Sequence, residues 1–372
     1  ILTMAVNSSL VYLQKKRIFC TEPFRIPLAG KVDTCAFDKT GTLTKDDLIY
    51  RGVVDDFQGS SHPIKMELES LSKEAQFIMA GCHSLVHNGG KLLGDPIEKA
   101  IFTHYKWHFS SNDKIASFSG KKCKIIQFNP FQSDLRRMST LISYFENEVQ
   151  RGYRAVVKGA PETMQLLYRP STVPKDYEKV YRQYAKTGYR ILALGYKKVS
   201  EEVSLSDLTR EDLESDLEFA GFLLFESILK ADTARYIKYL QDAAYAITMI
   251  TGDSELTACS VSRQLELTPL KDHLLLEVND KNELVWMNED FETISKATDK
   301  KEVAELAKKY TLALNGKALK YIETHFTTQL IRSIVDHTTV FARVSPSQKE
   351  YIIETMKSNG RGVVMCGDGT ND

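Results

Sequence analysis

The sequence predicts an α/β protein with a parallel sheet, interrupted by an inserted α+β domain with an antiparallel sheet. From about residue 229, helical periodicity alternates with short apolar segments, and one more apolar segment lies at 32–37, which is the pattern of a parallel sheet. Between about 45 and 228, short segments rich in β-branched and aromatic residues indicate an antiparallel sheet. Three of the apolar segments predicted for the parallel sheet lead into Asp38, Asp253 and Asp368.

The length and composition describe an ordinary globular protein. The 372 residues predict two domains or slightly more. The 49 Lys and Arg residues balance the 49 Asp and Glu residues, so nothing favours nucleic acid or an anionic membrane surface as a partner. The six scattered cysteines form no Cys-x-x-Cys pair, which fits a reducing cytosolic compartment. No apolar run approaches the roughly 18 residues that span a bilayer.

The first 31 residues predict a helix and a connector. Residues 1–17 are expected to form a helix that ends in three basic residues, which suit a helix C-terminus and also the cytosolic end of a membrane span. Residues 20–31 contain two prolines and predict an extended connector into the strand at 32–37. Because the chain starts on Ile1 and ends on Asp372, within a loop that is expected to be functional, we expect a piece of a longer protein.

The middle of the chain is expected to form the inserted α+β domain. Helical periodicity occurs at 65–83, 95–108 and 174–187. The expected strands are 123–128, 137–145, 153–158, 191–197 and 219–225. Cys82, His83 and His87 could suggest a metal site, but no second ligand pair of matching spacing exists, so we assign the pair Cys82-His83 to an amphipathic helix.

The last third of the chain alternates helices and strands. The expected helices are 231–244, 254–266, 300–309, 316–335 and 345–357. The expected strands are 246–250, 339–342 and 362–366. Pro346 suits the first position of the last helix. The polar segment 268–300 is interpreted as a hairpin or an excursion from the sheet.

The segment Asp38-Lys39-Thr40-Gly41-Thr42-Leu43-Thr44 directly follows the first predicted strand. Gly41 predicts a tight loop that brings backbone N–H groups close to a ligand, and ligands of α/β sheets bind beyond the carboxyl ends of strands. Asp38 is therefore placed to attack a phosphoryl group. The structural alternative is a solvated aspartate before a threonine-rich turn.

The three aspartates would converge if their strands were neighbours in a parallel sheet. Asp368, with Asp372 near, could then hold Mg²⁺, which prefers oxygen ligands. Lys349 and Arg343 could add positive charge at the transferred group. As the alternative, each aspartate alone could be a helix N-cap, and Asp253 directly precedes a predicted helix.

The chain resembles the P-type ATPases, whose phosphorylation motif is the segment that begins at Asp38. Four further segments match family motifs in the family's order: Lys158–Glu162, Met249–Asp253, Phe341–Val344 and Gly367–Asp372. The resemblance implies a Rossmann-like, haloacid dehalogenase-like phosphorylation domain at 26–44 and 229–372, truncated at its C-terminus. It also implies an inserted nucleotide-binding domain at 45–228 and a membrane-stalk helix end with its connector at 1–25.

The resemblance further implies ATP as substrate, Mg²⁺ as cofactor and a role for each matching residue. Implied catalytic residues are Asp38, Lys39, Thr40, Thr251, Gly252, Asp253 and Lys349. Implied nucleotide-binding residues are Glu98, Phe131, Arg136, Lys158, Gly159, Arg190 and Arg343, with Phe131 stacking on adenine. Implied metal ligands are Asp38, Thr40, Asp368 and Asp372. From the residues alone, Phe131 could be core, Lys158 a solvated strand end and Arg190 a surface charge.

Two features refine the resemblance. Related dehalogenase-like phosphatases carry an acid/base Asp two residues after the nucleophile, where this chain has Thr40, which predicts a longer-lived acyl phosphate. The connector Pro23–Val32 resembles branch A of the type V P-type ATPases, endoplasmic-reticulum proteins that act on misinserted transmembrane helices. The stretch 225–232 departs from the Asp-Pro-Pro hinge of many relatives.

We therefore expect the cytosolic catalytic portion of an endoplasmic-reticulum membrane ATPase that closes on ATP about hinges near 44–46 and 226–230. Its expected partners are ATP, its own actuator and transmembrane domains, and a transmembrane helix as substrate. Three alternatives remain open: a polyamine-exporting branch-B ATPase, a soluble dehalogenase-like phosphatase, and a non-catalytic nucleotide-binding module.

Overall fold

The computed structural model describes residues 2–270, 272–279, 281–296 and 299–369. The chain divides into two compact units. Unit 1 comprises the residues up to Thr44 together with those from Leu229 onward, and unit 2 comprises Lys45–Ile228. Within the described residues, no helix combines the length and the apolar character needed to cross a membrane.

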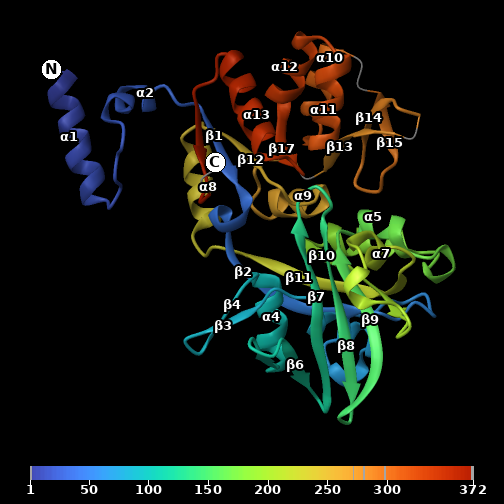
Figure 1. Cartoon of the computed structure of the whole chain (residues 1–372). Helices are drawn as coiled ribbons and strands as arrows, with labels where there is room; N and C mark the ends of the chain where they lie inside the picture. The colour runs from blue at the N-terminus through green and yellow to red at the C-terminus, as the bar shows by residue number, and fades with distance from the viewer. Residues whose placement is uncertain (1, 271, 280, 297–298, 370–372) are drawn as a thin grey trace. The chain divides into compact units, whose positions relative to one another are not determined.

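Unit 1 is built on a sheet with the strand order β15-β14-β13-β16-β17-β12-β1-β18 (Figure 1). The neighbours from β13 to β18 in this order pair in parallel. These parallel strands are β1 (Thr34–Asp38), β12 (Ala246–Ile250), β13 (His273–Val278), β16 (Thr311–Asn315), β17 (Thr338–Ala342) and β18 (Val363–Cys366). The antiparallel strands β14 (Leu284–Met287) and β15 (Thr293–Lys296) extend the β13 edge.

Helices connect the parallel strands and cover the sheet. They are α8 (Thr233–Asp242), α9 (Glu255–Gln264), α10 (Lys300–Ala307), α11 (Gly316–His325), α12 (Thr328–His337) and α13 (Pro346–Ser358). Side-chain caps fix where α9 to α13 begin, whereas α8 has no side-chain cap. At the start of α13, Ser345 forms a capping box with Gln348, with Pro346 in the first turn as predicted. Strand residues such as Ile250 and Phe341 pack with helix residues such as Ile352 in one buried core.

Four predictions for unit 1 need correction. The expected helix 316–335 is two helices, because the Thr327 side chain accepts a hydrogen bond from the Leu330 amide and starts α12. Strand β16 was not predicted, and β13, within the expected excursion, belongs to the parallel sheet. The connector is not extended throughout, since it contains a 3₁₀ turn at Pro23–Arg25 and helix α2 (Ile26–Ala29). Both elements have a proline in their first turn, where the backbone N–H that proline lacks would have no partner within the helix.

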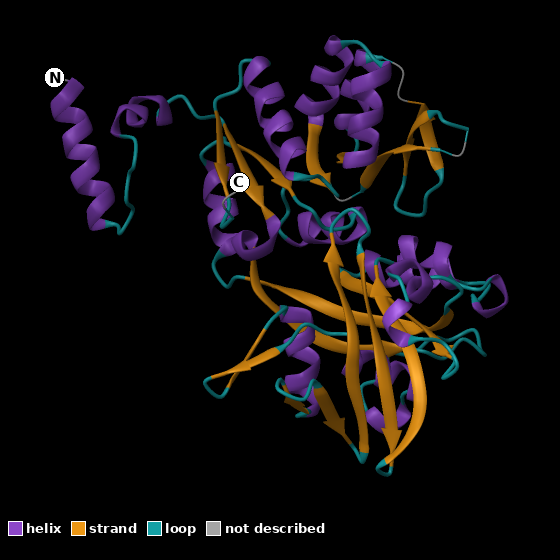
Figure 2. Ribbon diagram, in the orientation of Figure 1, coloured by secondary structure: helices purple, strands orange, loops and turns teal. Residues whose placement is uncertain are grey.

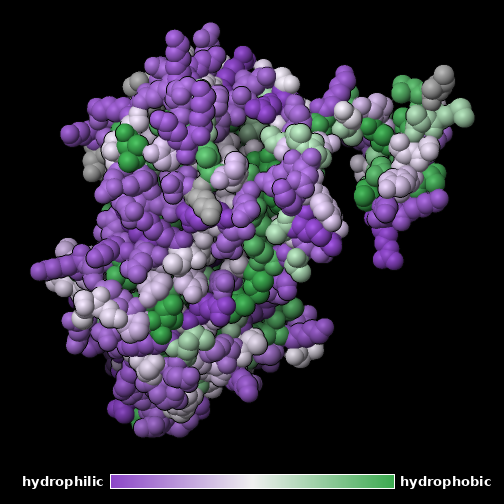
Figure 3. Space-filling view, turned by 180° about the vertical axis from the view of Figure 1, so that it is seen from behind, coloured by the Kyte–Doolittle hydropathy of each residue, from purple (hydrophilic) through white to green (hydrophobic). Residues whose placement is uncertain are grey.

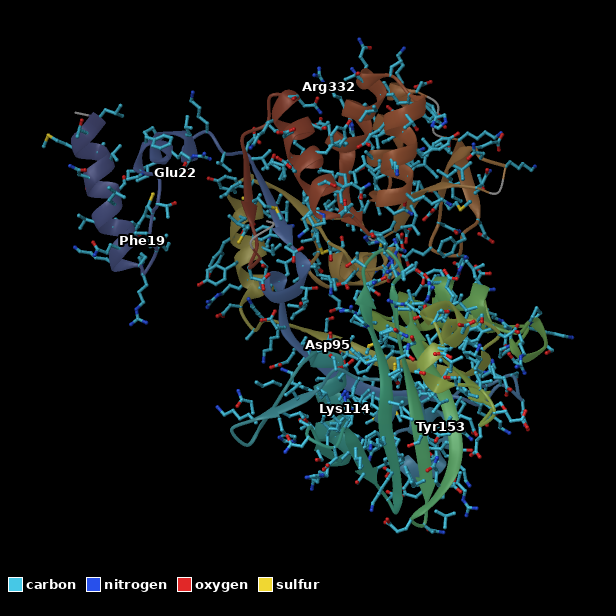
Figure 4. The ribbon with its side chains drawn as sticks, viewed as in Figure 1. Phe19, Glu22, Asp95, Lys114, Tyr153 and Arg332 are labelled. Carbon is cyan, nitrogen blue, oxygen red and sulfur yellow. The ribbon has the colours of Figure 1, made fainter. Side chains whose placement is uncertain are left out.

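The N-terminal helix α1 (Leu2–Lys15) has no buried residue among those described. Its exposed apolar side chains are Leu2, Met4, Val11 and Tyr12. The space-filling view shows hydrophobic surface on this segment (Figure 3). Phe19, just beyond the helix, is also exposed (Figure 4).

Unit 2 contains a sheet with the order β2-β11-β10-β9-β8-β7-β6-β5, whose neighbours from β11 to β5 are antiparallel. Figure 2 draws the strands of this sheet as orange arrows. Its strands are β2 (Thr44–Val54), β5 (His108–Ser110), β6 (Ile115–Phe118), β7 (Lys121–Gln132), β8 (Arg137–Glu146), β9 (Val149–Gly159), β10 (Tyr189–Val199) and β11 (Glu218–Leu229). A separate hairpin pairs β3 (Val86–Asn88) with β4 (Lys91–Leu93). The helices are α3 (Lys73–Gly81), α4 (Pro96–Tyr105), α5 (Pro161–Met164), α6 (Tyr177–Lys186) and α7 (Arg210–Glu214).

The predicted fold class is confirmed, since a sheet with parallel strands and an antiparallel sheet both occur. All five strands expected in the insert lie within β7 to β11. The expected helix 65–83 is shorter, because Ser72 caps α3 and the preceding residues form only a 3₁₀ turn at Leu68–Ser70. Strand β2 was not predicted, since its polar residues Lys45, Asp46 and Asp47 hide the strand pattern.

Candidate active site

The carboxyl edge of the parallel sheet brings the three aspartate-bearing loops together. Strand β1 lies between β12 and β18, with Asp38 opposite Ile250 and Phe37 opposite Cys366 (Figure 1). Because the strands are parallel, the loops after Asp38, Ile250 and Cys366 leave the sheet at the same edge. Asp253 and Asp368 therefore follow the two strands that flank β1, as their predicted convergence requires. The predicted metal ligand Asp372 lies outside the described residues.

Asp38 is the last residue of β1 and forms a buried ion pair. The Lys349 ammonium lies 2.9 Å from its Oδ1 atom, and both residues are about one-tenth exposed. Lys349 belongs to the start of α13, which the Ser345 capping box fixes. A cation held against the carboxylate can also stabilise negative charge on a group that this carboxylate attacks.

Asp253 is held by the loop that follows Asp38. Its Oδ2 atom lies 2.6 Å from the Lys39 ammonium and accepts a hydrogen bond from the Thr40 hydroxyl at 3.2 Å. Lys39 is only 1% exposed. The alternative that Asp253 caps helix α9 is wrong, because Ser254 is the N-cap and accepts from the Thr257 amide. The Asp253 carboxylate is thus available to organise the Asp38 loop.

Backbone bonds join Asp253 to its neighbours. The Thr251 hydroxyl accepts a hydrogen bond from the Asp253 amide at 3.1 Å. The Arg343 amide donates to the Asp253 carbonyl at 2.9 Å, and the Val344 amide donates to the Thr251 carbonyl at 3.2 Å. The structure therefore brings together the 251–253 and 343–344 segments, which the sequence analysis placed in one site. Gly252 lies within this loop, between the two bonded residues.

Two residues that support the Asp38 loop were not predicted. The loop turns at Gly41, whose φ of 79° favours glycine. The Lys230 ammonium donates to the Gly41 carbonyl. The Thr233 hydroxyl donates to the Leu43 carbonyl at 2.9 Å. The only sequence signal was that Lys230 lies in the stretch that departs from the family hinge, which by itself does not predict a contact with the loop.

The donor set at this sheet edge fits a hard cation. Asp38, Thr40 and Asp368 offer oxygen atoms; Asp38 ends β1, and Asp368 follows the neighbouring parallel strand β18. Oxygen donors of this kind suit Mg²⁺ rather than softer metals. The residues expected to hold Mg²⁺ thus lie at the ends of adjacent strands, and the metal site itself stays a prediction.

A second group of side chains with metal-ligand chemistry has a structural explanation. Within the described ranges, Cys259, His273 and Glu289 place their ligand atoms within 4.8 Å of one another. The Arg263 guanidinium already donates to Glu289, and the His273 Nδ1 atom lies 3.2 Å from the same carboxylate. Because a cation already neutralises the carboxylate, we interpret the group as an ion-pair network that joins α9 to β13.

Unit 2 contains a buried ion pair between two predicted nucleotide-binding residues. The Lys158 ammonium lies 2.7 Å from the Glu98 Oε1 atom, and Glu98 is 2% exposed. The Glu98 Oε2 atom accepts from the Ser84 amide and hydroxyl, at 2.7 and 3.0 Å. Burial alone would lower the pKa of Lys158, but the Glu98 charge raises it above its ordinary value. The alternative of Lys158 as a solvated strand end is therefore wrong.

The elements around this pair are fixed by their own caps. Asp95 caps helix α4 by accepting from the Ile97 amide, which orients the first turn that carries Glu98 (Figure 4). Lys158 lies on β9 opposite Met138 of β8 and Leu194 of β10. Both partners of the ion pair are thus held by regular structure.

Phe131 lies near the end of β7, and Arg136 lies in the turn that joins β7 to β8. Phe131 is 59% exposed, so the alternative of a core residue is wrong. Arg136 has a φ of 49°, and its carbonyl accepts from the Ala160 amide at 3.0 Å. A Cβ atom at Gly159 would lie 2.8 Å from that carbonyl, so the close approach requires glycine. The β7–β8 turn is thereby packed against the end of β9.

Arg190 lies at the same end of the sheet. Gly159 pairs with Arg137 on one side and with Ala193 on the other, and Arg190 lies three residues before Ala193 on β10. Arg190 is half-buried, which differs from the alternative of a fully solvated surface charge. Within unit 2, the structure therefore places Phe131, Arg136, Gly159 and Arg190 at one end of neighbouring strands.

His83 follows helix α3 rather than lying in it, which corrects the interpretation of Cys82-His83 as helical. Its Nδ1 atom accepts from the Leu85 amide at 3.1 Å, and its ring packs edge-on against Phe102 and Phe109. Burial, with a smaller contribution from the Lys158 charge, lowers the pKa of His83 to about 3. The imidazole is therefore neutral at physiological pH.

We expect His83 to make unit 2 sensitive to acid. Its pKa is lower in the folded than in the unfolded state, so its contribution to stability is present above about pH 6.5 and is lost as the pH falls towards about 3. Over that window the free energy of unfolding should fall by up to about 1.4 kcal/mol per pH unit relative to His83→Asn. Urea unfolding at several pH values measures this difference, and parallel pH curves for the two proteins would contradict it.

Comparison with known proteins finds a P-type ATPase domain and relatives named as ATPases or translocases. Residues 74–230 match the family model described as P-type ATPase, cytoplasmic domain N. A probable manganese-transporting ATPase of Arabidopsis thaliana is 39% identical over 100% of this chain and 31% of its own length. Proteins named endoplasmic reticulum transmembrane helix translocase, from Schizosaccharomyces pombe and Saccharomyces cerevisiae, are 41% and 38% identical over 100% of this chain.

A more distant relative is named for a different substrate. The polyamine-transporting ATPase of Mus musculus is 30% identical over 100% of this chain and 35% of its own length. The chain spans 31% of the length of the S. pombe protein and 30% of the S. cerevisiae protein.

Proposed function

Because the chain belongs to the P-type ATPase family, we propose that it hydrolyses ATP through an aspartyl-phosphate formed on Asp38. The observation that carries this proposal is the buried Asp38 at the end of β1, with the Lys349 ammonium 2.9 Å from its Oδ1 atom. A carboxylate in this position can attack, and the lysine stabilises charge on the group under attack.

In the proposed reaction, a carboxylate oxygen of Asp38 attacks the γ-phosphorus of ATP. The bond between that phosphorus and the β–γ bridging oxygen breaks, and ADP leaves with the bonding electron pair. Lys349 compensates the charge of the phosphoryl oxygens. Lys39 and Thr40 hold Asp253, which fixes the loop that carries the nucleophile. Water later attacks the phosphorus and releases phosphate.

Magnesium would be held by Asp38, Thr40 and Asp368, with Asp372 from the end of the chain. When bound, Mg²⁺ neutralises charge on the phosphoryl oxygens and orients them for transfer. The support for this assignment is the oxygen-only donor set after two neighbouring parallel strands.

Nucleotide binding is proposed for unit 2. Phe131 offers an exposed ring for the adenine base. The base of the proposed nucleotide site is formed by Gly159 and by the ion pair of Lys158 with Glu98. Arg136 and Arg190 supply positive charge for the phosphates at the same end of the sheet. We assign Arg343, beside the 251–253 loop in unit 1, to the nucleotide phosphates as well.

Thr40 favours an ATPase over a simple phosphatase. It occupies the position where a phosphatase of this fold carries a carboxylate, and its hydroxyl donates to Asp253. A threonine donor cannot accept a proton from attacking water as a carboxylate does, so the aspartyl-phosphate should persist. A persistent intermediate suits coupling to conformational work in a larger protein.

Labelling with γ-labelled ATP tests the reaction. We expect Mg²⁺-dependent label on the 372-residue chain that is stable in acid and released by hydroxylamine, as an acyl phosphate is. A phosphatase would instead cleave small phosphate esters and keep no label. A non-catalytic nucleotide-binding module would bind ATP, but it would neither become labelled nor cleave phosphate esters.

For the whole protein, we propose the extraction or translocation of transmembrane helices at the endoplasmic reticulum, with this chain on the cytosolic face. The support is that two relatives named for that activity are 38–41% identical over the whole chain, against 30% for the polyamine transporter. The relative named as a probable manganese-transporting ATPase is 39% identical, which makes Mn²⁺ the second candidate substrate. The full-length protein in proteoliposomes should show ATPase activity that rises with a transmembrane-helix peptide. Stimulation by a polyamine or by Mn²⁺ instead would assign a different substrate.

A further inference from the structure

A buried charge cluster in unit 2 lies beside the β7–β8 turn. At its centre is Glu214, the last residue of α7, which is 2% exposed. Its Oε2 atom lies 2.5 Å from the Arg137 Nε atom. Its Oε1 atom accepts from the Ser139 hydroxyl and from the Arg210 Nε atom, both at 2.8 Å. One carboxylate therefore neutralises and orients two guanidinium groups.

The two guanidinium groups hold the backbone of the turn. Arg210 donates to the Pro130 carbonyl at 3.2 Å and to the Arg137 carbonyl at 3.0 Å. Arg137 donates to the Leu135 carbonyl at 3.4 Å. These three carbonyls flank Phe131 and Arg136 on both sides. A chain of charge-assisted contacts thus runs from Glu214, through two arginines, to the segment that presents the exposed ring.

We propose that Glu214 is a positioning residue for nucleotide binding, which it supports by fixing the end of β7 that carries Phe131 and the following turn that carries Arg136. The inference rests on the proposed function of unit 2. A turn that is already ordered in the free protein loses less conformational freedom when a ligand stacks on it, so the ligand binds more tightly. Without the carboxylate, two neighbouring guanidinium groups would repel each other and release the carbonyls that they hold.

The variant Glu214→Gln keeps the shape of the side chain and removes its charge. We expect the Kd for ATP, ADP and adenosine to rise by about tenfold, the effect of about one charge-assisted hydrogen bond. Hydrogen exchange of the amides at 131–136 should accelerate, while that of the β9 amides should stay unchanged. The conservative variant Glu214→Asp should recover part of the affinity. Glu211→Gln on the exposed face of the same helix is the matched control and should leave the Kd unchanged.

The outcomes separate positioning from a general structural role. An unchanged Kd in Glu214→Gln overturns the inference. So does a loss of Tm with accelerated exchange throughout unit 2, since the residue would then act on the fold as a whole. Phe131→Ala is measured alongside: an unchanged Kd in that variant would overturn the proposed nucleotide site itself, independently of Glu214.

Discussion

Replacing Asp38 by Asn should abolish labelling of the chain by γ-labelled ATP, with a loss of at least about a thousandfold. The amide has nearly the shape of the carboxylate and can still accept a hydrogen bond from Lys349, which lies 2.9 Å from Oδ1. It lacks the anionic oxygen that forms the bond to phosphorus. The loss should therefore concern chemistry rather than folding, and the quantity to measure is acid-stable label per mole of protein.

The matched control for this prediction lies directly before the same strand. Asp33 is an exposed carboxylate that precedes the amino end of β1, whereas Asp38 ends the strand at its carboxyl edge. Asp33→Asn should leave the label unchanged, since only the carboxyl edge carries the proposed chemistry. Undiminished label in Asp38→Asn would move the nucleophile to another residue and remove the basis of the proposed mechanism.

Replacing Lys158 by Met should reduce the free energy of unfolding of unit 2 by about 3–5 kcal/mol. The substitution leaves the Glu98 carboxylate, which is 2% exposed, without the cation that lies 2.7 Å away. The Ser84 hydrogen bonds to its other oxygen cannot neutralise the charge. Urea unfolding measures the change, and the same variant should bind ATP more weakly.

A second variant isolates the charge from the shape of the side chain. Adding Glu98→Gln to Lys158→Met removes the uncompensated charge, so most of the lost stability should return. Lys124→Met, an exposed lysine on β7 of the same sheet, is the matched control and should change the stability by less than about 0.5 kcal/mol. A double variant no more stable than Lys158→Met would show that packing rather than charge dominates at this position.

Much of the fold could be predicted because its signals are local. The apolar segments at 246–250 and 362–366 correspond to β12 and β18, since a buried strand needs only consecutive apolar residues. Strand β2 was not found in the same way, because its exposed first half, Lys45–Asp47, is charged, although Tyr50, Val53 and Val54 in its second half are buried. The boundary between α11 and α12 at Thr327 was not predicted, because the helical periodicity of the apolar residues continues from one helix into the next.

The candidate site was only partly predictable, for a similar reason. The segment that begins at Asp38 identified the proposed nucleophile and its loop by their residues alone. The support that Lys230, Thr233 and Glu214 provide had no sequence signal, because each acts through a contact with residues far away in the chain. Long-range contacts of this kind depend on how the elements pack.

By itself, the sequence determined the fold class, the strand ends that carry Asp38, Asp253 and Asp368, and the family resemblance. These depend on residues that are close neighbours in the chain. Only the tertiary structure decided that β1 lies between β12 and β18, that Lys349 pairs with Asp38 across 311 residues, and that Asp253 binds the loop rather than capping a helix. The physical reason is that parallel strands require crossover connections, so the order of strands in the sheet sets which distant side chains meet.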